Sequence, residues 1–329
     1  MSFLEQLEVR AAAAGGRVAL AEGHDPRVVE AAADLAARGV FEIFLVCPEG
    51  DRRDAHAPLE AAGVEIVDPA TDSRREDLAA FLHQRRAHKG LSELEALEAV
   101  DDPLYFASLL VATGLADASV GGAVRTTADT VRAALHCIGP GAGLRTVSSA
   151  FVMVHPDPTW GDDGVKVFSD CAVLPDPDPK QLAEIAISAA ATYRSIVGGE
   201  PRVALHSFST KGSANHPLVA KVEAACAELG SRDLDFEFDG ELQFDAALVS
   251  RVGESKAPGS TVAGRANVLV FPDLNAGNIT YKAAERLGGA RALGPLMQGL
   301  AKPANDLSRG CSAGDIVQTS LLSLLQAKG

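Results

Sequence analysis

Short apolar runs separated by helical segments constrain the fold of this chain more than any other feature of its sequence. Runs of strand length occupy residues 17–21, 41–46, 64–68 and 116–120. Helical segments lie between them, the clearest from Pro26, at the first helical position, to Arg38, just before Gly39. Strands buried on both faces of a parallel sheet are continuous in apolar residues, and their crossovers are usually helices. The sequence therefore predicts an α/β fold.

The chain has 329 residues, which is enough for two domains. Residues 138–143, Ile-Gly-Pro-Gly-Ala-Gly, are non-periodic and form a candidate boundary. Beyond them, we expect 146–154 and 165–168 to pair as strands around a loop at 155–163, which is either a hairpin extension or a lid. A long helix should follow at 179–197.

The net charge limits the classes of partner that this protein can have, and the cysteines indicate its cellular compartment. A net charge of −14 argues against nucleic acid and anionic membranes as partners. The basic cluster at 85–89 stands out against it, and is either a local anion pocket or a solvated helix end. The five cysteines are dispersed without a C-x-x-C pair, and no run of 18 uncharged apolar residues or signal-peptide pattern occurs. We therefore expect a cytoplasmic protein without disulfides or a zinc site.

Three polar loops follow predicted strands, at the edge where open α/β sheets place their ligands. The segment 121–132 combines two glycines with Thr126 and Thr127, which favours a phosphate-cradling turn; an N-cap is the alternative. The loop 206–216 is rich in hydroxyls and contains Lys211, as a phosphoryl or carboxylate pocket would be, or else it is a capped turn. The loop 272–279 contains Asn and Gly that a plain turn would also use.

The segment 305–315 places Ser308, Arg309 and Asp315 before an apolar final helix. Ser312 is a good N-cap, and Asp315 lies three residues later, close to a capping box. Backbone N–H groups at a helix N-terminus favour an anion, so we predict a site that binds a negatively charged group and moves a proton beside it. Alternatively, Asp315 only caps the helix and Arg309 only pairs with Asp306.

Several collinear blocks, together spanning nearly the whole chain, closely resemble the phosphotransacetylase (phosphate acetyltransferase) family, which also holds phosphate butyryltransferase. They include Ser-Phe-Ser-Thr-Lys-Gly-Ser-Ala at 207–214 and Asn-Asp-Leu-Ser-Arg-Gly-Cys-Ser at 305–312. The others lie at 122–132, 239–247, 256–260, 271–279 and 298–303.

The resemblance implies two doubly wound α/β domains, similar to isocitrate and isopropylmalate dehydrogenases, with a central cleft. Residues 1–143 plus 294–329 would form the first domain and 144–293 the second. It also implies a homodimer that transfers an acetyl group between acetyl phosphate and coenzyme A (CoA), releasing phosphate. No bound cofactor or metal is implied, since CoA is a substrate.

By motif position, the resemblance assigns Ser308, Arg309 and Asp315 to catalysis. Substrate and CoA binding are assigned to the arginines Arg27, Arg86, Arg132 and Arg286 and to the loop residues Thr127, Thr210, Lys211, Gly212, Ser213 and Asn278. Departures from the family pattern, which leave the acyl-chain preference and the regulation open, occur at Arg125, His206, Asn275 and Thr280.

The residues suit this chemistry independently. A thiol attacks poorly until it loses its proton, which Asp315 would take as general base. Arg309 can stabilise the oxyanion and the departing phosphate through its bidentate fork. Ser308 either hydrogen-bonds the substrate or is a nucleophile. Because the motif holds no His to activate it, we favour direct transfer in a ternary complex, with Cys311 as a packing residue.

Two other functions remain open from the sequence. One is acyl transfer with a longer chain, such as butyryl. The other is a non-catalytic acyl-CoA-sensing module, which the intact Ser308, Arg309 and Asp315 disfavour. A dehydrogenase is least favoured, since the sequence has no dinucleotide-binding fingerprint.

Overall fold

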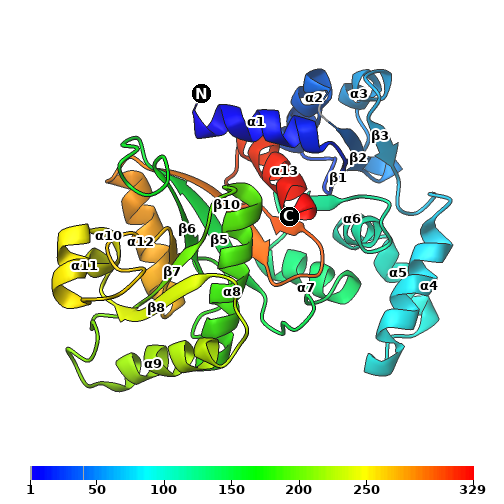
Figure 1. The fold of residues 1–329 in the computed structure, drawn as a ribbon. Coiled ribbons are helices and arrows are strands. Elements are labelled where there is room, and N and C mark those ends of the chain that lie inside the picture. Colours follow the sequence, from blue (N-terminus) through cyan, green and yellow to red (C-terminus); the bar gives the residue numbers. More distant parts are fainter. Residues whose placement is uncertain (1, 40) are drawn as a thin grey trace. The chain divides into compact units, whose positions relative to one another are not determined.

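A computed structural model describes residues 2–39 and 41–329. The chain forms two compact units (Figure 1): one is built from the residues up to Ala142 together with Leu300–Lys328, and the other from Gly143–Gly299. None of the described helices is long and apolar enough to cross a membrane.

The first unit contains a five-stranded sheet whose neighbouring strands all pair in parallel. In spatial order its strands are β11 (Ala304–Asp306), β4 (Ala118–Gly121), β1 (Arg17–Leu20), β2 (Glu42–Val46) and β3 (Glu65–Val67). In the register, Val120 lies beside both Leu20 and Asn305. The segments that follow β1, β4 and β11 therefore emerge together at one edge of the sheet.

Helices cover both faces of this sheet, which explains why most of its strand residues are apolar and buried. The helix α13 packs against α1, α2 and β4, whereas α6 packs against α7, β4 and β1. The bounds of the helices are α1 (Phe3–Ala14), α2 (Pro26–Arg38), α3 (Ala57–Ala61), α4 (Arg75–Arg86), α5 (Glu93–Val100), α6 (Pro103–Ala112), α7 (Thr127–Cys137) and α13 (Ala313–Lys328). Short 3₁₀ turns lie at η1 (Glu49–Asp51), η2 (Asp54–His56) and η3 (Ala87–Lys89).

The second unit contains a six-stranded mixed sheet. Its order is β10 (Arg291–Gln298), β5 (Ser148–Val154), β6 (Val165–Ser169), β9 (Val268–Val270), β7 (Arg202–His206) and β8 (Glu237–Leu242). The pairs β10–β5 and β5–β6 are antiparallel, and the remaining pairs are parallel. Two sheets of mainly parallel strands with covering helices confirm the predicted α/β class.

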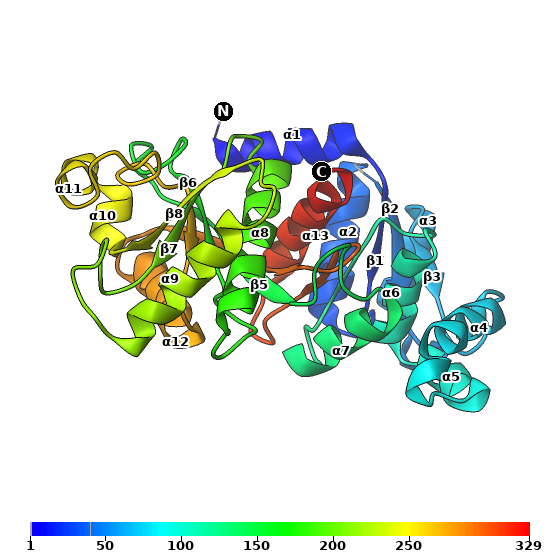
Figure 2. The same cartoon turned by 60° about the horizontal axis from the view of Figure 1, so that its bottom comes forward.

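The helices of the second unit are α8 (Pro179–Ile196), α9 (Pro217–Gly230), α10 (Phe244–Leu248), α11 (Ser250–Lys256) and α12 (Leu274–Arg286). Figure 2 shows α8 and α9 side by side, and α8 packs against β5, β6, β7, β9 and β10.

The loop at 155–163 connects the antiparallel strands β5 and β6, and its end is anchored to the body of the unit. Asp162 accepts hydrogen bonds from the Tyr193 hydroxyl, from Arg202 at 3.0 Å and from Asn267 at 2.8 Å. A carboxylate that accepts from three separate groups fixes its segment in place. The structure therefore favours the hairpin extension over the lid.

Candidate active site

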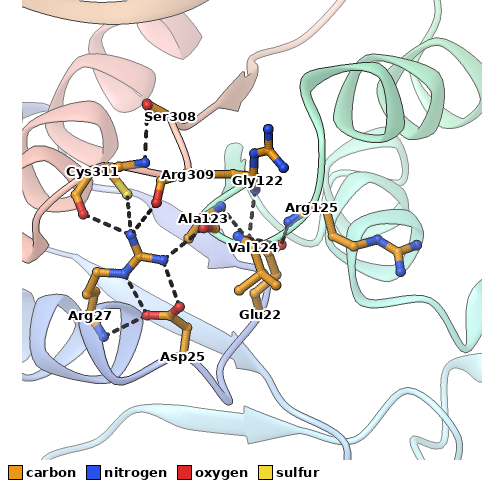
Figure 3. Close-up of polar contacts among 11 residues, drawn as sticks. Glu22, Asp25, Arg27, Gly122, Ala123, Val124, Arg125, Ser308, Arg309 and Cys311 are labelled. Atoms are coloured by element: carbon orange, nitrogen blue, oxygen red, sulfur yellow. Dashed lines mark hydrogen bonds and ion pairs between the residues drawn. The ribbon is translucent and has the colours of Figure 1, made fainter.

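The first predicted phosphate turn, which follows β4, is filled by a carboxylate of the chain itself (Figure 3). Glu22 accepts hydrogen bonds from the backbone N–H groups of Gly122, Ala123, Val124 and Arg125, at 2.9, 2.7, 3.2 and 2.8 Å. The Glu22 residue is 2% exposed. These four N–H groups are therefore not available to a phosphate while Glu22 keeps this position, contrary to the cradle expected from the sequence.

Glu22 is a residue of the candidate site that the sequence did not reveal. It has a φ of 63°, in the left-handed region that residues with a Cβ seldom adopt. Strained residues of this kind persist where the surrounding structure fixes them, often at functional sites. Its partners lie about a hundred residues away in the chain, so only the parallel pairing of β1 with β4 brings them together.

Arg27 holds the turn that carries the predicted catalytic residues (Figure 3). Its guanidinium donates to the backbone oxygens of Arg309, Cys311 and Ala123 at 2.8, 3.0 and 2.8 Å. It also donates twice to the Asp25 carboxylate, at 3.0 and 2.8 Å. An Arg has five N–H donors, and all five are used here. In this arrangement Arg27 supports the site and has no N–H left for CoA.

The pair of Arg27 and Asp25 is mutually stabilising. The hydrogen bonds from Arg27 lower the pKa of Asp25 below its ordinary value, and the same contact raises the pKa of Arg27. Asp25 also caps α2 by accepting from the Arg27 backbone N–H at 2.8 Å. The start of α2 and the 309–311 turn are thus tied through one ion pair.

At the start of α13, Asp315 forms the predicted capping box with Ser312. Its Oδ2 accepts from the Ser312 backbone N–H at 2.8 Å and from the Ser312 hydroxyl at 2.9 Å. In return, the Asp315 N–H donates to Ser312 Oγ at 3.2 Å. The side chains of Ser308, Arg309 and Asp315 are exposed around this helix start. Among the described residues, no ion pair joins Arg309 to Asp306.

Thr127 and Asp306 join the start of α7 to the end of β11. The Thr127 hydroxyl donates to Asp306 Oδ2 at 2.6 Å. Burial, and to a smaller extent the charge of Glu22, raise the pKa of Asp306 to about 6. The segment that leads into Ser308 and Arg309 therefore starts from a buried carboxyl group.

The two predicted CoA arginines of the first unit lie near one imidazole. The pKa of His136 is lowered, first by burial and then by the charges of Arg86 and Arg132. His136 Nδ1 is 2.8 Å from the Tyr105 hydroxyl, and Arg132 pairs with Asp129 at 2.9 Å. The structure thus brings Arg86, the last residue of α4, together with Arg132 on α7.

In the second unit, the loop after β7 is wrapped around a buried carboxylate. Glu241 Oε1 accepts from the Ser209 hydroxyl at 2.9 Å and from the Gly212 N–H at 2.8 Å. The Thr210 N–H donates to Ser213 Oγ at 3.0 Å, and Lys211 forms an ion pair with Asp239. This is the capped turn of the alternative interpretation, and Glu241, which the sequence did not reveal, is its centre.

The remaining two predicted residues lie on α12. Asn278 donates to the backbone oxygen of Cys171 at 3.0 Å, so it serves the framework of this unit. The Arg286 side chain is 80% exposed and lies 3.4 Å from Glu285. Arg286 is therefore free to reach a solvent-borne anion.

Comparisons with known proteins assign the family. The model of the phosphate acetyl/butaryl transferase family matches residues 2–324. A phosphate acetyltransferase of Acetivibrio thermocellus is 44% identical over 328 residues, covering 100% of this chain and 99% of the relative. The crystal structure of a phosphotransacetylase from Streptococcus pyogenes is 40% identical with a TM-score of 0.91, covering 99% of this chain and 98% of that one.

A more distant structure bears on the fold alone. A protein assigned as a 4-hydroxythreonine-4-phosphate dehydrogenase, from Salmonella typhimurium, superposes with a TM-score of 0.54 at 12% identity, over 95% of this chain and 99% of that one. The dehydrogenase-like fold expected from the sequence is therefore confirmed. With a family match over almost its full length, the chain belongs to the phosphate acetyl/butaryl transferase family of acyltransferases.

Proposed function

We propose that this protein transfers an acetyl group reversibly between acetyl phosphate and CoA, with release of phosphate. The observation that carries the proposal is the arrangement of Ser308, Arg309 and Asp315 around the start of α13, with Arg27 holding the turn between them. The relative that is 44% identical is named a phosphate acetyltransferase, which supports acetyl as the transferred group. CoA, acetyl phosphate and inorganic phosphate are then the small-molecule partners.

In the proposed mechanism, Asp315 accepts the thiol proton of CoA. Ser312 engages one oxygen, Oδ2, which leaves Oδ1 for the proton. An ordinary carboxylate is a weak base toward a thiol, so the proton moves as the sulfur attacks the acetyl carbon in a ternary complex. The bond between the sulfur and the acetyl carbon forms. The bond between the acetyl carbon and the bridging phosphate oxygen breaks, and phosphate leaves with both electrons of that bond.

Arg309 and Ser308 stabilise the charge that develops in this step. The backbone of Arg309 is fixed by Arg27, while its guanidinium stays exposed and can bind the phosphoryl oxygens in bidentate fashion. The Ser308 hydroxyl accepts from the Gly310 N–H at 3.2 Å, so its own proton is available to the acetyl carbonyl or to phosphate.

We further propose that Arg86 and Arg132 bind phosphate groups of CoA. The positive charges of both guanidinium groups act on His136, next to the start and side of α7 where an anion would be attracted. The two substrates and Asp315 account for every atom of the transfer, so we propose that no further cofactor takes part. Activity should then survive exhaustive EDTA treatment.

A homodimer in the cytoplasm is the proposed physiological form. Ile279 and Leu287 are 66% and 89% exposed, and Ala283 between them is exposed as well. Residues four apart lie on one face of a helix, so these three make an apolar stripe, and such patches mark interaction surfaces. The free thiols of all five cysteines suit a reducing compartment.

The test of the function is CoA-dependent release of phosphate from acetyl, propionyl and butyryl phosphate, compared by kcat/KM. We expect acetyl phosphate to be the best substrate. A preference for butyryl phosphate would assign the longer-chain reaction instead. Binding of acetyl-CoA without turnover of any of the three would support the sensing module and refute the proposal.

A further inference from the structure

Asp306 is a buried carboxyl group with an incomplete set of partners. The residue is 2% exposed, and its Oδ1 has no hydrogen-bond partner. Gly122, at a φ of 94°, lies so close that a Cβ there would collide with this oxygen. A buried ionised oxygen without a donor is unfavourable, so this group is poised to take up a proton.

The other oxygen of Asp306, Oδ2, accepts the only proton of the Thr127 hydroxyl. Thr127 Oγ1 donates to Oδ2 at 2.6 Å, and Thr127 is the exposed first residue of α7. A hydroxyl has one proton to donate and two lone pairs to accept. While Asp306 is ionised, the Thr127 proton points inward, and the outer side of the hydroxyl can only accept.

The groups around Asp306 move its pKa toward neutral pH. Burial and, to a smaller extent, the negative charge of Glu22 raise the pKa of Asp306 to about 6, against the Thr127 hydrogen bond and the nearby polar groups of Thr130 and Leu307. Glu22 faces it from the segment after β1, and the two threonines face it from α7. Among the described residues, no Lys or Arg forms an ion pair with Asp306.

We propose that Asp306 is a positioning residue that controls, through its own protonation, whether the Thr127 hydroxyl can donate a hydrogen bond to a bound anion. This rests on the proposed function, because the anion is the phosphoryl group of that reaction. Protonated Asp306 donates to Thr127 Oγ1, and the Thr127 proton turns outward to the anion. Binding of an anion and uptake of one proton by Asp306 are therefore coupled, and the coupling is reciprocal.

Sulfate is the probe, since its charge does not change near neutral pH as that of phosphate does. Calorimetric titrations should show wild-type protein binding sulfate about tenfold more tightly at about pH 5.5 than at about pH 7.5, as linkage to one proton requires. Repeating the titration at about pH 7.5 in buffers of different ionisation enthalpy should reveal uptake of about one proton on binding, since the free carboxyl group is mostly ionised at that pH.

Two substitutions and a control isolate the hydrogen bond. The amide of Asp306→Asn can donate to Thr127 as the protonated acid does, so this variant should bind sulfate tightly at both pH values. Thr127→Val should bind weakly at both, because it has no proton to donate. Thr127→Ser keeps the hydroxyl and should retain the wild-type pH dependence.

A second measurement needs no ligand. In pH-difference infrared spectra, the C=O band of a buried carboxylic acid should titrate with a midpoint of about 6 and be missing in Asp306→Asn. Wild-type sulfate binding that is no tighter at the lower pH would overturn the proposal, as would an unchanged pH dependence in Asp306→Asn. Neither measurement requires turnover, so failure of acetyl transfer would refute the proposed function and leave this result standing.

Discussion

At the scale of single residues, Asp315 has two roles that substitution can separate. Asp315→Asn can still accept the bonds from Ser312 but cannot take a thiol proton. We expect kcat to fall about 10²–10⁴-fold, the usual contribution of a general base, with the melting temperature nearly unchanged. Steady-state kinetics and thermal unfolding check both halves.

Ser312→Ala is the matched control for Asp315. It removes the cap and keeps the carboxylate, so it should lower stability by about 1 kcal/mol while kcat changes little. Near-wild-type kcat in Asp315→Asn would leave Asp315 as a helix cap and refute the catalytic assignment.

His206 should make the protein sensitive to acid. Its ring packs 5.3 Å from Phe244 and 5.5 Å from Phe271 between centroids, and its Nε2 is buried without a partner. Burial lowers the pKa of His206 to about 4 from 6.5. The unfolded state therefore binds more protons as pH falls through this window, and the native state loses up to about 3 kcal/mol of stability.

His206→Leu removes this titration, so its stability should fall less than that of the wild type between about pH 7 and about pH 4. Urea midpoints at the two pH values test this, since the other titrating groups are common to both proteins. Equal losses in the two proteins would mean that His206 is not held neutral in the native state.

At the scale of elements, Arg27 links the start of α2 to the turn before α13. Arg27→Lys keeps the positive charge but loses the planar fork that serves five acceptors. We expect kcat to fall about tenfold or more as the turn loosens, since small misplacements of catalytic groups are costly, whereas KM for CoA should change little. A raised KM for CoA with unchanged kcat would instead indicate direct contact with CoA.

The elements that could be predicted from the sequence are those that depend on residues close together in the chain. The strand β2, the helix α2 and the capping box of α13 were predicted because each depends on neighbouring residues, such as Pro26 at the first helical position and Ser312 with Asp315. The helix α6 was not predicted, because its buried residues lie all around its axis and leave no polar stripe. The Asp102–Pro103 start would have identified it.

In the candidate site too, the features set by neighbouring residues were predicted and those set by distant residues were not. The motif residues at 308–315 were identified from the sequence, and the capping geometry of Asp315 follows from spacing alone. Glu22 and Glu241 were missed because their partners are set by the pairing of strands far apart in the chain. No local pattern distinguishes a carboxylate that fills a loop from one that faces solvent.

At the scale of the whole molecule, we predict that the apolar stripe of Ile279, Ala283 and Leu287 forms the interface of the proposed homodimer. In the homodimer proposed above, the double substitution Ile279→Glu with Leu287→Glu should yield a monomer, because it would place two charges on each side of the proposed interface. Light scattering coupled to size-exclusion chromatography measures the mass. Leu94→Glu on α5, at a position 65% exposed, is the control and should leave the mass of the wild type unchanged.

The carboxylates inside the loops after β4 and β7 have a consequence for the entropy of the proposed substrate binding. A loop closed around Glu22 or Glu241 has its backbone donors satisfied before any substrate arrives. The conformation of such a loop is therefore fixed when the protein folds, and it does not have to be fixed again when a ligand binds. Binding then carries little loss of chain entropy at these segments, and their amide protons should resist hydrogen exchange as well in the free protein as in the complex.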